Sequence, residues 1–297
     1  AASDVYKRQL LTNIDINVDW GDSSEIENFK TDKPTHIYTD AGTYIVSVTG
    51  HCDIISSENI NMVALTKIIS WGDDNFEYSK LSRCCQGCTN LSSIPNDEYG
   101  AFYKVTAFEY GFRHCQSLKS IPNGLFSHCE KLVYGSNLFA GCSNLTSIPE
   151  HLFDKLVNVR GLSSLFSECT GLTSIPEDLF KDCINATTMN GVFNGCSGLT
   201  SIPENLFKYN TKVQSFISIF ANCTGLTSIP EGLFTNCTEV TGFTSAFSSC
   251  RNLSSIPEKL FDNCHEVISF HGTFSLCHKL TISIPCLLYT SPSPRDR

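Results

Sequence analysis

The feature that most constrains this sequence is a cysteine that recurs with a 27-residue period. A leucine, an isoleucine–proline pair and two aromatic residues keep the same spacing over at least seven units. One unit of this length is too short to enclose all of its own apolar side chains. The period therefore predicts a solenoid, in which each coil buries its core against the coils on either side. The repeating cysteines are Cys88, Cys115, Cys142, Cys169, Cys196, Cys223, Cys250 and Cys277.

Each part of the unit predicts a local structure. The Leu-Thr-Ser-Ile segment at 226–229 is typical of a short strand in a parallel sheet, which the following proline ends. Pro230 and Glu231 suit the start of a helical turn. The return side, residues 240–247, is either a second strand or a second helical turn. The predicted fold class is a repeat solenoid of short parallel strands and helical turns, with the aromatic column that begins at Tyr99 in its core.

The motif F-x-x-C-x-x-L-x-S-I-P, which runs from Phe139 to Pro149, resembles the BspA-like leucine-rich repeats of bacterial surface proteins. The resemblance covers residues 63–285, although the unit is a few residues longer than the commonest form of that family. It implies a leucine-rich-repeat solenoid of about seven repeats over residues 88–285. Residues 51–87 are expected to cap the open end of the core.

Residues 10–50 have a different pattern. The W-G-D sequence that starts at Trp20 predicts a turn, and the alternating apolar residues of 42–48 predict a half-buried strand. Together with the His-Ile-Tyr sequence at 36–38, they resemble the second half of a polycystic-kidney-disease-type (PKD) β-sandwich domain. This implies a partial all-β domain. Calcium binding by Asp19, Asp22 and Asp40 is a second interpretation of the turn, but turn formation is the commoner role of such aspartates.

Residues 1–9 and 286–297 fit neither pattern and are similar to translated adaptor sequence at the ends of metagenomic reading frames. We therefore expect a metagenomic fragment of a longer bacterial protein. No signal peptide is visible, and no apolar stretch approaches the roughly 20 residues of a membrane span. The net charge is −9 and lysine and arginine do not cluster, which argues against nucleic-acid binding.

The cysteines do not indicate a chemical site. At a second cysteine position, leucine and asparagine replace cysteine in two units, which favours buried, reduced thiols over obligatory disulfides, although some disulfides remain an alternative. Cys84, Cys85 and Cys88 mimic half of a zinc site, but their spacing belongs to the repeat and no second pair supplies the remaining ligands. We therefore predict no metal site. The second position is occupied by Cys129, Leu156, Cys183, Asn210, Cys237 and Cys264.

The remaining polar residues predict no catalysis. A carboxylate follows the proline in five units, and we favour compensation of a helix start over cation binding. No nucleophile motif accompanies the eight histidines, so we expect no enzyme and no cofactor. The five carboxylates are Glu150, Glu177, Glu204, Glu231 and Glu258.

Hydroxyl side chains along the predicted strand are the candidate binding face, because solenoids bind through such extended faces. The family resemblance implies a secreted or surface-anchored protein that contacts a protein or glycan on a host or neighbouring cell. The alternative is a structural spacer that presents another domain, which the close similarity of the repeats favours. The predicted binding residues are Thr146, Thr173, Thr200, Thr227 and Ser254.

Overall fold

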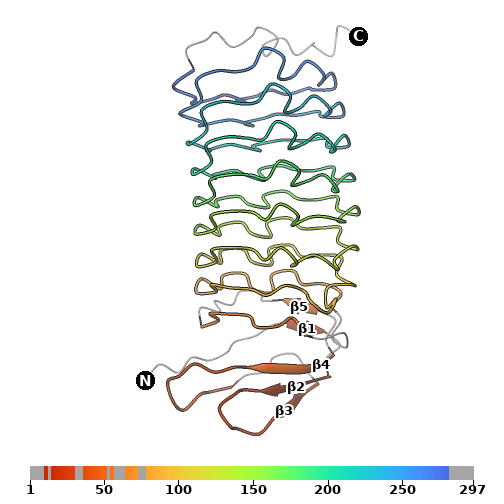
Figure 1. The fold of residues 1–297 in the computed structure, drawn as a ribbon, viewed down its shortest axis with the longest axis vertical. Coiled ribbons are helices and arrows are strands. Elements are labelled where there is room, and N and C mark those ends of the chain that lie inside the picture. Colours follow the sequence, from red (N-terminus) through yellow and green to blue (C-terminus); the bar gives the residue numbers. More distant parts are fainter. Residues whose placement is uncertain are drawn as a thin grey trace.

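The computed structural model describes residues 10–12, 15–30, 36–51, 54–56, 64–72 and 78–280. A group of short antiparallel strands at the N-terminal end is followed by a long stack of similar coils (Figure 1). The terminal segments that we interpret as adaptor sequence, 1–9 and 286–297, lie outside the described residues. Within the described part, no helix is long and apolar enough to cross a membrane.

The N-terminal strands form two small sheets. Strand β2 (Asp15–Asp19) lies between β3 (Glu27–Phe29) and β4 (Ser47–His51), and β1 (Leu10–Thr12) pairs with β5 (Ile54–Ser56). All of these pairs are antiparallel. Alternate residues of β2 are buried, as expected for a strand with one face on a core. The all-β character predicted for this segment is therefore present.

The predicted strand over 42–48 begins only at Ser47. The segment before it runs against the W-G-D turn. Gly21 has a φ of 74°, and a Cβ placed there would lie 2.3 Å from the Ile45 carbonyl oxygen. Ile45 is thus held against the turn, and the strand starts after it.

From Tyr78 to Leu280 the chain forms coils that repeat with the period of the sequence and stack in register (Figure 1). Single parallel β-bridges join each coil to the next on the return side of the unit. Of the two structures left open for that side, both are present: Gly242 pairs as extended chain, and residues 244–249 form turns. The bridged residues are Lys80, Ala107, Tyr134, Gly161, Thr188, Ser215, Gly242 and Ser269.

The parallel pairing was predicted on the wrong side of the coil. On the Leu-Thr-Ser-Ile side, the described residues form only one bridge, Lys67 to Ser93. The cross-coil bonds there include long ones, such as Thr146 N–H to the Lys119 carbonyl at 3.4 Å. Burial of a leucine and an isoleucine three residues apart bends this segment, and the next residue, proline, has no N–H to donate.

The predicted helical turns are also absent from the described residues, which contain no helix. Leu233 N–H donates to the Pro230 carbonyl at 3.4 Å, and Cys237 N–H donates to the Phe234 carbonyl at 3.0 Å. Between them, Thr235 N–H donates to the Gly232 carbonyl at 3.1 Å, so these are overlapping four-residue turns. A helix needs a bond from each consecutive N–H along the chain, and here only alternate N–H groups make one. Proline does begin a hydrogen-bonded turn, as expected, but that turn is not continued as a helix.

Two columns of aromatic rings form the centre of the stack. Phe193 lies between Phe166 and Phe220, with ring centroids 5.9 and 5.5 Å apart and interplanar angles of 9° and 5°. Phe180 and Phe207 form the same kind of pair in the second column, 6.2 Å apart. All five rings are fully buried. A ring in one coil is therefore packed against its own equivalents, which is the contact that the period predicted.

The first coil departs from this pattern. Tyr99 occupies the aromatic position in sequence but is 61% exposed, so its predicted place in the core is wrong. Phe102, three residues later, fills the core instead and is fully buried. The cause is Asp97, whose carboxylate accepts hydrogen bonds from the N–H groups of Ala101 and Phe102 at 2.8 and 3.1 Å. These bonds close a different turn and rotate Tyr99 outward.

Two positions of each coil have a left-handed backbone. One of them repeats through Tyr110, Asn137 and Ser164, with φ values of 59°, 59° and 56°. The other repeats through His114 and its equivalents in later coils. Left-handed φ costs a residue with a side chain about 1–2 kcal/mol, so these corners are imposed by the stacking of the coils. The second position is occupied by Gly87, His114, Gly141, Glu168, Gly195, Asn222, Ser249 and Leu276.

Candidate interaction surfaces

The five predicted binding residues share one exposed column, with one residue per coil. Thr146, Thr173, Thr200, Thr227 and Ser254 are all exposed. We call this column the hydroxyl face. Some of its hydroxyls also support the stack. Ser254 Oγ donates to the Thr227 carbonyl at 3.1 Å, and Thr173 Oγ1 lies 3.5 Å from the Thr146 carbonyl.

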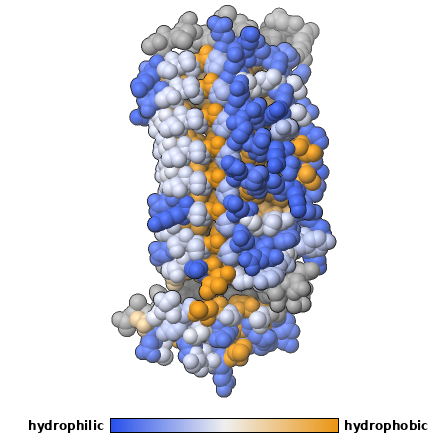
Figure 2. Space-filling view, in the orientation of Figure 1, coloured by the Kyte–Doolittle hydropathy of each residue, from blue (hydrophilic) through white to orange (hydrophobic). Residues whose placement is uncertain are grey.

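The side of the solenoid seen in Figure 2 is banded along its whole length. A pale band of weakly polar residues runs beside a narrow apolar stripe, and strongly hydrophilic residues lie on the other side of that stripe. Because each coil repeats the same residue types, one column of the sequence becomes one stripe of the surface.

The glutamate column has a structural contact that the sequence did not predict. Glu177 Oε1 accepts a hydrogen bond from the Asn205 N–H of the next coil at 3.0 Å. Asn96 replaces glutamate in the first coil, and its Oδ1 accepts the equivalent bond from Gly124 N–H at 2.9 Å. Within the described stack, no helix start exists for the carboxylates to compensate. In these two coils the side chain instead satisfies a backbone donor one coil away.

The cysteines form an internal column, and their predicted burial is confirmed. Every cysteine of the described part is buried and free. Thiols of the main column donate to a backbone carbonyl of the preceding coil, as from Cys196 to Phe166 at 3.1 Å and from Cys223 to Phe193 at 3.0 Å. Burial raises the pKa of Cys196 to about 12. These thiols thus stay protonated and act as buried donors.

Asn210 shows why asparagine can replace cysteine at the second position. Its Nδ2 donates to the carbonyls of Phe180 and Cys183, both at 3.0 Å. Cys264 directs its Sγ toward the Phe234 carbonyl from the same position, at 3.9 Å. The position therefore accommodates a small buried side chain, and a donor there can bond to the preceding coil.

The C-x-x-C sequence lies inside the first coils. Cys84, Cys85, Cys88 and Cys115 are at most 3% exposed. Hydrogen bonds from the thiols of Cys115 and Cys85 lower the pKa of Cys88, and the same contact with Cys88 raises the pKa of Cys115. Among the residues that the structure describes, no group of three or more His, Cys, Asp or Glu side chains could hold a metal ion.

The N-terminal aspartates make the contacts of turns. Asp19 Oδ1 accepts from Gly21 N–H at 2.8 Å, and Asp22 Oδ1 accepts from Ser24 N–H at 3.1 Å. Asp22 Oδ2 lies 2.6 Å from His36 Nε2. The hydrogen bonds from Ser24 and His36 lower the pKa of Asp22 to about 2. Asp40 contacts Thr39 instead, so the three carboxylates do not meet at one point.

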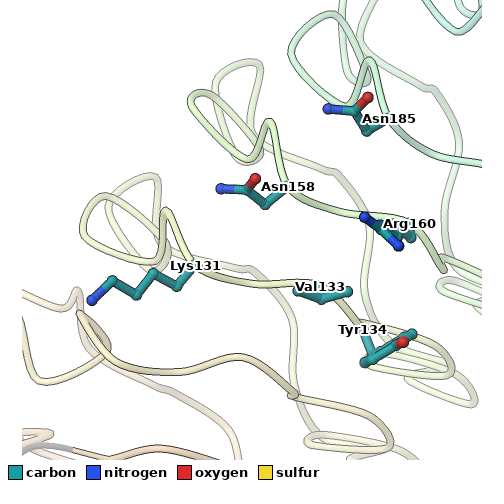
Figure 3. Close-up of a pocket in the computed structure, with 6 residues that line it drawn as sticks. All are labelled: Lys131, Val133, Tyr134, Asn158, Arg160 and Asn185. Carbon is teal, nitrogen blue, oxygen red and sulfur yellow. The ribbon is translucent and has the colours of Figure 1, made fainter.

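One surface was missed in the sequence. Six residues line an open hollow of about 570 Å³ on the bridged side of the coils (Figure 3). We call it the basic hollow. In the sequence, this site could be recognised only by residues that differ from their equivalents in other coils. The predicted binding residues were chosen instead from positions that are nearly the same from coil to coil. Arg160 stands where later coils carry Thr187 and Gln214, and Tyr134 stands where later coils carry small residues. The six residues are Lys131, Val133, Tyr134, Asn158, Arg160 and Asn185.

Comparison with solved structures finds bacterial leucine-rich-repeat proteins. A leucine-rich repeat protein from Eubacterium ventriosum is 17% identical, with 70% of this chain and 60% of that chain covered and a TM-score of 0.40. The leucine-rich repeat protein of T. pallidum is 16% identical, with 76% and 92% covered and a TM-score of 0.34. This chain thus matches less than two thirds of the length of the Eubacterium protein. No curated protein matches the chain.

The family of BspA-type leucine-rich-repeat regions matches the chain in six copies, over residues 52–160 and 146–278. These ranges contain nearly all of the bridged stack and most of its capping segment. They do not include residues 10–51, for which the PKD-like assignment stays a prediction. The match covers well over half of the sequence. The chain therefore belongs to the family of BspA-type leucine-rich-repeat proteins.

Proposed function

We propose that the chain is a non-enzymatic binding protein of the bacterial surface or the extracellular space, which acts through the face of its solenoid in adhesion or protein–protein contact. The observation that carries the proposal is the hydroxyl face, which presents one exposed hydroxyl in each of five successive coils. Membership of the BspA-type family supports a surface binding role. The partner is a protein or glycan on a host or neighbouring cell.

Rigidity makes such a face suitable for binding. Each of these hydroxyl residues directly follows a fully buried leucine of the stacked core, and short side chains lose little conformational freedom when they are covered. A rigid surface avoids part of the ordering cost that opposes association. Threonine and serine also donate and accept hydrogen bonds, so one column can contact an extended partner repeatedly.

The test is binding of the purified chain to a panel of immobilised extracellular-matrix proteins and intact host cells. The variant Thr173→Ala/Thr200→Ala/Thr227→Ala removes three adjacent hydroxyls of the face. We expect it to weaken binding by at least tenfold. The matched control makes the same three changes at exposed turn positions, Thr211, Thr235 and Thr238, and should bind as the unchanged chain does. Equal binding by both variants would contradict a role for the hydroxyl face.

The second candidate is a structural spacer, which the near-identity of the units favours. Four of the five hydroxyl-face residues are threonine, whereas selection for one partner usually differentiates the coils of a solenoid. A spacer would bind no member of the panel. Binding that the triple variant abolishes would exclude a role as spacer alone.

A further inference from the structure

We infer that the basic hollow is a second interaction surface, which binds an acidic peptide segment of a partner protein. The inference rests on the proposed function in one respect, namely that the chain binds other proteins. It concerns another side of the coil and another chemistry. The hydroxyl face is nearly constant from coil to coil, whereas the basic hollow is particular to the coils that contain Tyr134 and Arg160.

Charge is the first argument. Lys131 and Arg160 both line the hollow in a chain whose net charge is −9. Lys131 Nζ lies 4.2 Å from the centre of the exposed Tyr103 ring of the preceding coil and points away from Arg160 (Figure 3), so the two cations flank the hollow. Arg160 is exposed, and its guanidinium has the geometry for two parallel hydrogen bonds to a carboxylate. The site therefore favours an anionic group.

The apolar surroundings favour a peptide over a polyanionic sugar. Val133 and the half-exposed ring of Tyr134 line the hollow together with Arg160. Val157 and Ile184, which precede Asn158 and Asn185 in the chain, are 41% and 44% exposed. Tyrosine and arginine beside exposed apolar side chains form the typical centre of a protein interface. A peptide segment that alternates acidic and apolar residues can pair with the cations and also cover the exposed apolar side chains.

Asn158 and Asn185 donate to carbonyls of the preceding coil at 2.9 and 2.8 Å, whereas the Arg160 side chain is not needed for the stack. Thr187 N–H donates to the Arg160 carbonyl at 2.9 Å, and Gln214 N–H donates to the Thr187 carbonyl at the same distance. Arginine, threonine and glutamine thus support the same backbone ladder. The stack does not explain why arginine occupies one coil. Substitution by the residue of the next coil should leave the fold intact, which permits a clean test.

The probe is the fluorescein-labelled peptide GEFEGEFEG, and its neutral control is GQFQGQFQG. The full chain should bind the acidic peptide, and the affinity should fall as salt rises, because exposed charges are screened. The variant Lys131→Asn/Arg160→Thr, which introduces the residues of the following coils, should raise the Kd at least tenfold. The control Lys119→Thr/Lys259→Asn removes the same charge elsewhere and should leave the Kd within twofold.

Three outcomes would overturn the inference. These are equal binding of both peptides, equal loss in both double variants, and binding of an acidic polysaccharide such as polysialic acid in place of the peptide. The proposed function fails separately. If the panel of matrix proteins and cells binds through the hydroxyl face while the peptide does not bind, only the basic hollow is refuted. If the peptide binds and the panel does not, the adhesion role is refuted.

Discussion

At the scale of single residues, the repeated cysteine has a similar structural role in successive coils. Cysteine is a small buried donor in this chain. Each thiol of the main column fills core volume, and most satisfy a carbonyl of the preceding coil, as Cys169 does for Phe139 at 3.2 Å. Burial raises the pKa of the Cys169 thiol, because a thiolate in an apolar core loses its hydration. The many cysteines therefore have a common structural explanation.

Thiol reactivity tests this directly. In the native chain at pH 8, Cys169, Cys196 and Cys223 should resist iodoacetamide, since only an accessible thiolate reacts and these residues are fully buried. In denaturant they should react fully and be identified by mass spectrometry. Labelling of the native chain at the rate of an exposed thiol, or thiols already oxidised in the unfolded chain, would contradict the structure.

Two glycines of the stack differ in the space available for a side chain. A Cβ added to Gly225 would lie 2.5 Å from the Leu199 carbonyl oxygen and 2.7 Å from that of Ser197, whereas nothing lies within 4 Å of one added to Gly242. We expect Gly225→Ala to lower the free energy of unfolding by about 1–3 kcal/mol through overpacking. The control Gly242→Ala should be neutral or slightly stabilising. Urea unfolding of both variants measures the difference, and equal midpoints would contradict the predicted contact.

At the scale of the coil, the sequence predicted the period, the columns and the buried rings, because stacking forces equivalent residues together. It placed the parallel pairing on the wrong side of the coil. Apolar spacing alone made the Leu-Thr-Ser-Ile segment a strand, whereas its bend and its proline reduce pairing there. The prediction that Tyr99 is buried was wrong for a local reason, because Asp97 redirects the first turn. The hydroxyl face followed from a constant column, and the basic hollow was missed because it lies in variable ones.

The central ring of an aromatic column should be the most sensitive position of a coil. Phe193→Ala removes a fully buried ring that stacks on Phe166 and Phe220. We expect a loss of about 3–5 kcal/mol in the free energy of unfolding. Tyr99→Ala, at the exposed aromatic position of the first coil, should cost less than about 1 kcal/mol. Chemical unfolding followed by circular dichroism compares them. Similar losses would mean that Tyr99 is in the core.

In the turn between β2 and β3, Asp22 makes the stability of the N-terminal sheet depend on pH in the acid range. Its pKa falls from the ordinary value of 3.8 to about 2, so the folded state favours the carboxylate. The stabilisation is complete above pH 3.8 and disappears as the pH falls through about 2. We expect Asp22→Asn to lower the melting temperature at pH 6 and to have no effect near pH 1.5. A difference between the variant and the unchanged chain that persists at pH 1.5 would contradict this assignment, and Asp40→Asn serves as the control.

At the scale of the whole molecule, the fold is a linear series of nearest-neighbour contacts. Most hydrogen bonds outside the turns join a residue to a position about one coil away, and so do the stacked ring pairs, such as Phe139 with Phe166. Such an array gains its stability from its interfaces, and no single coil is sufficient. The same construction gives the surface its long stripes. The repeated columns thus build the stack, while binding belongs to the exposed columns and to coils that depart from the repeat.

The measurement that tests this construction most directly is native-state hydrogen exchange of individual amides. The N–H groups of Phe139, Phe193 and Phe220 donate to Leu165, Ile219 and Ala246 of the next coil at 2.8–3.0 Å. We predict slow exchange at these sites, with protection recurring once per coil at equivalent positions through the stack. Fast exchange at the three phenylalanines, or protection that does not follow the period of the coils, would contradict the stacked solenoid.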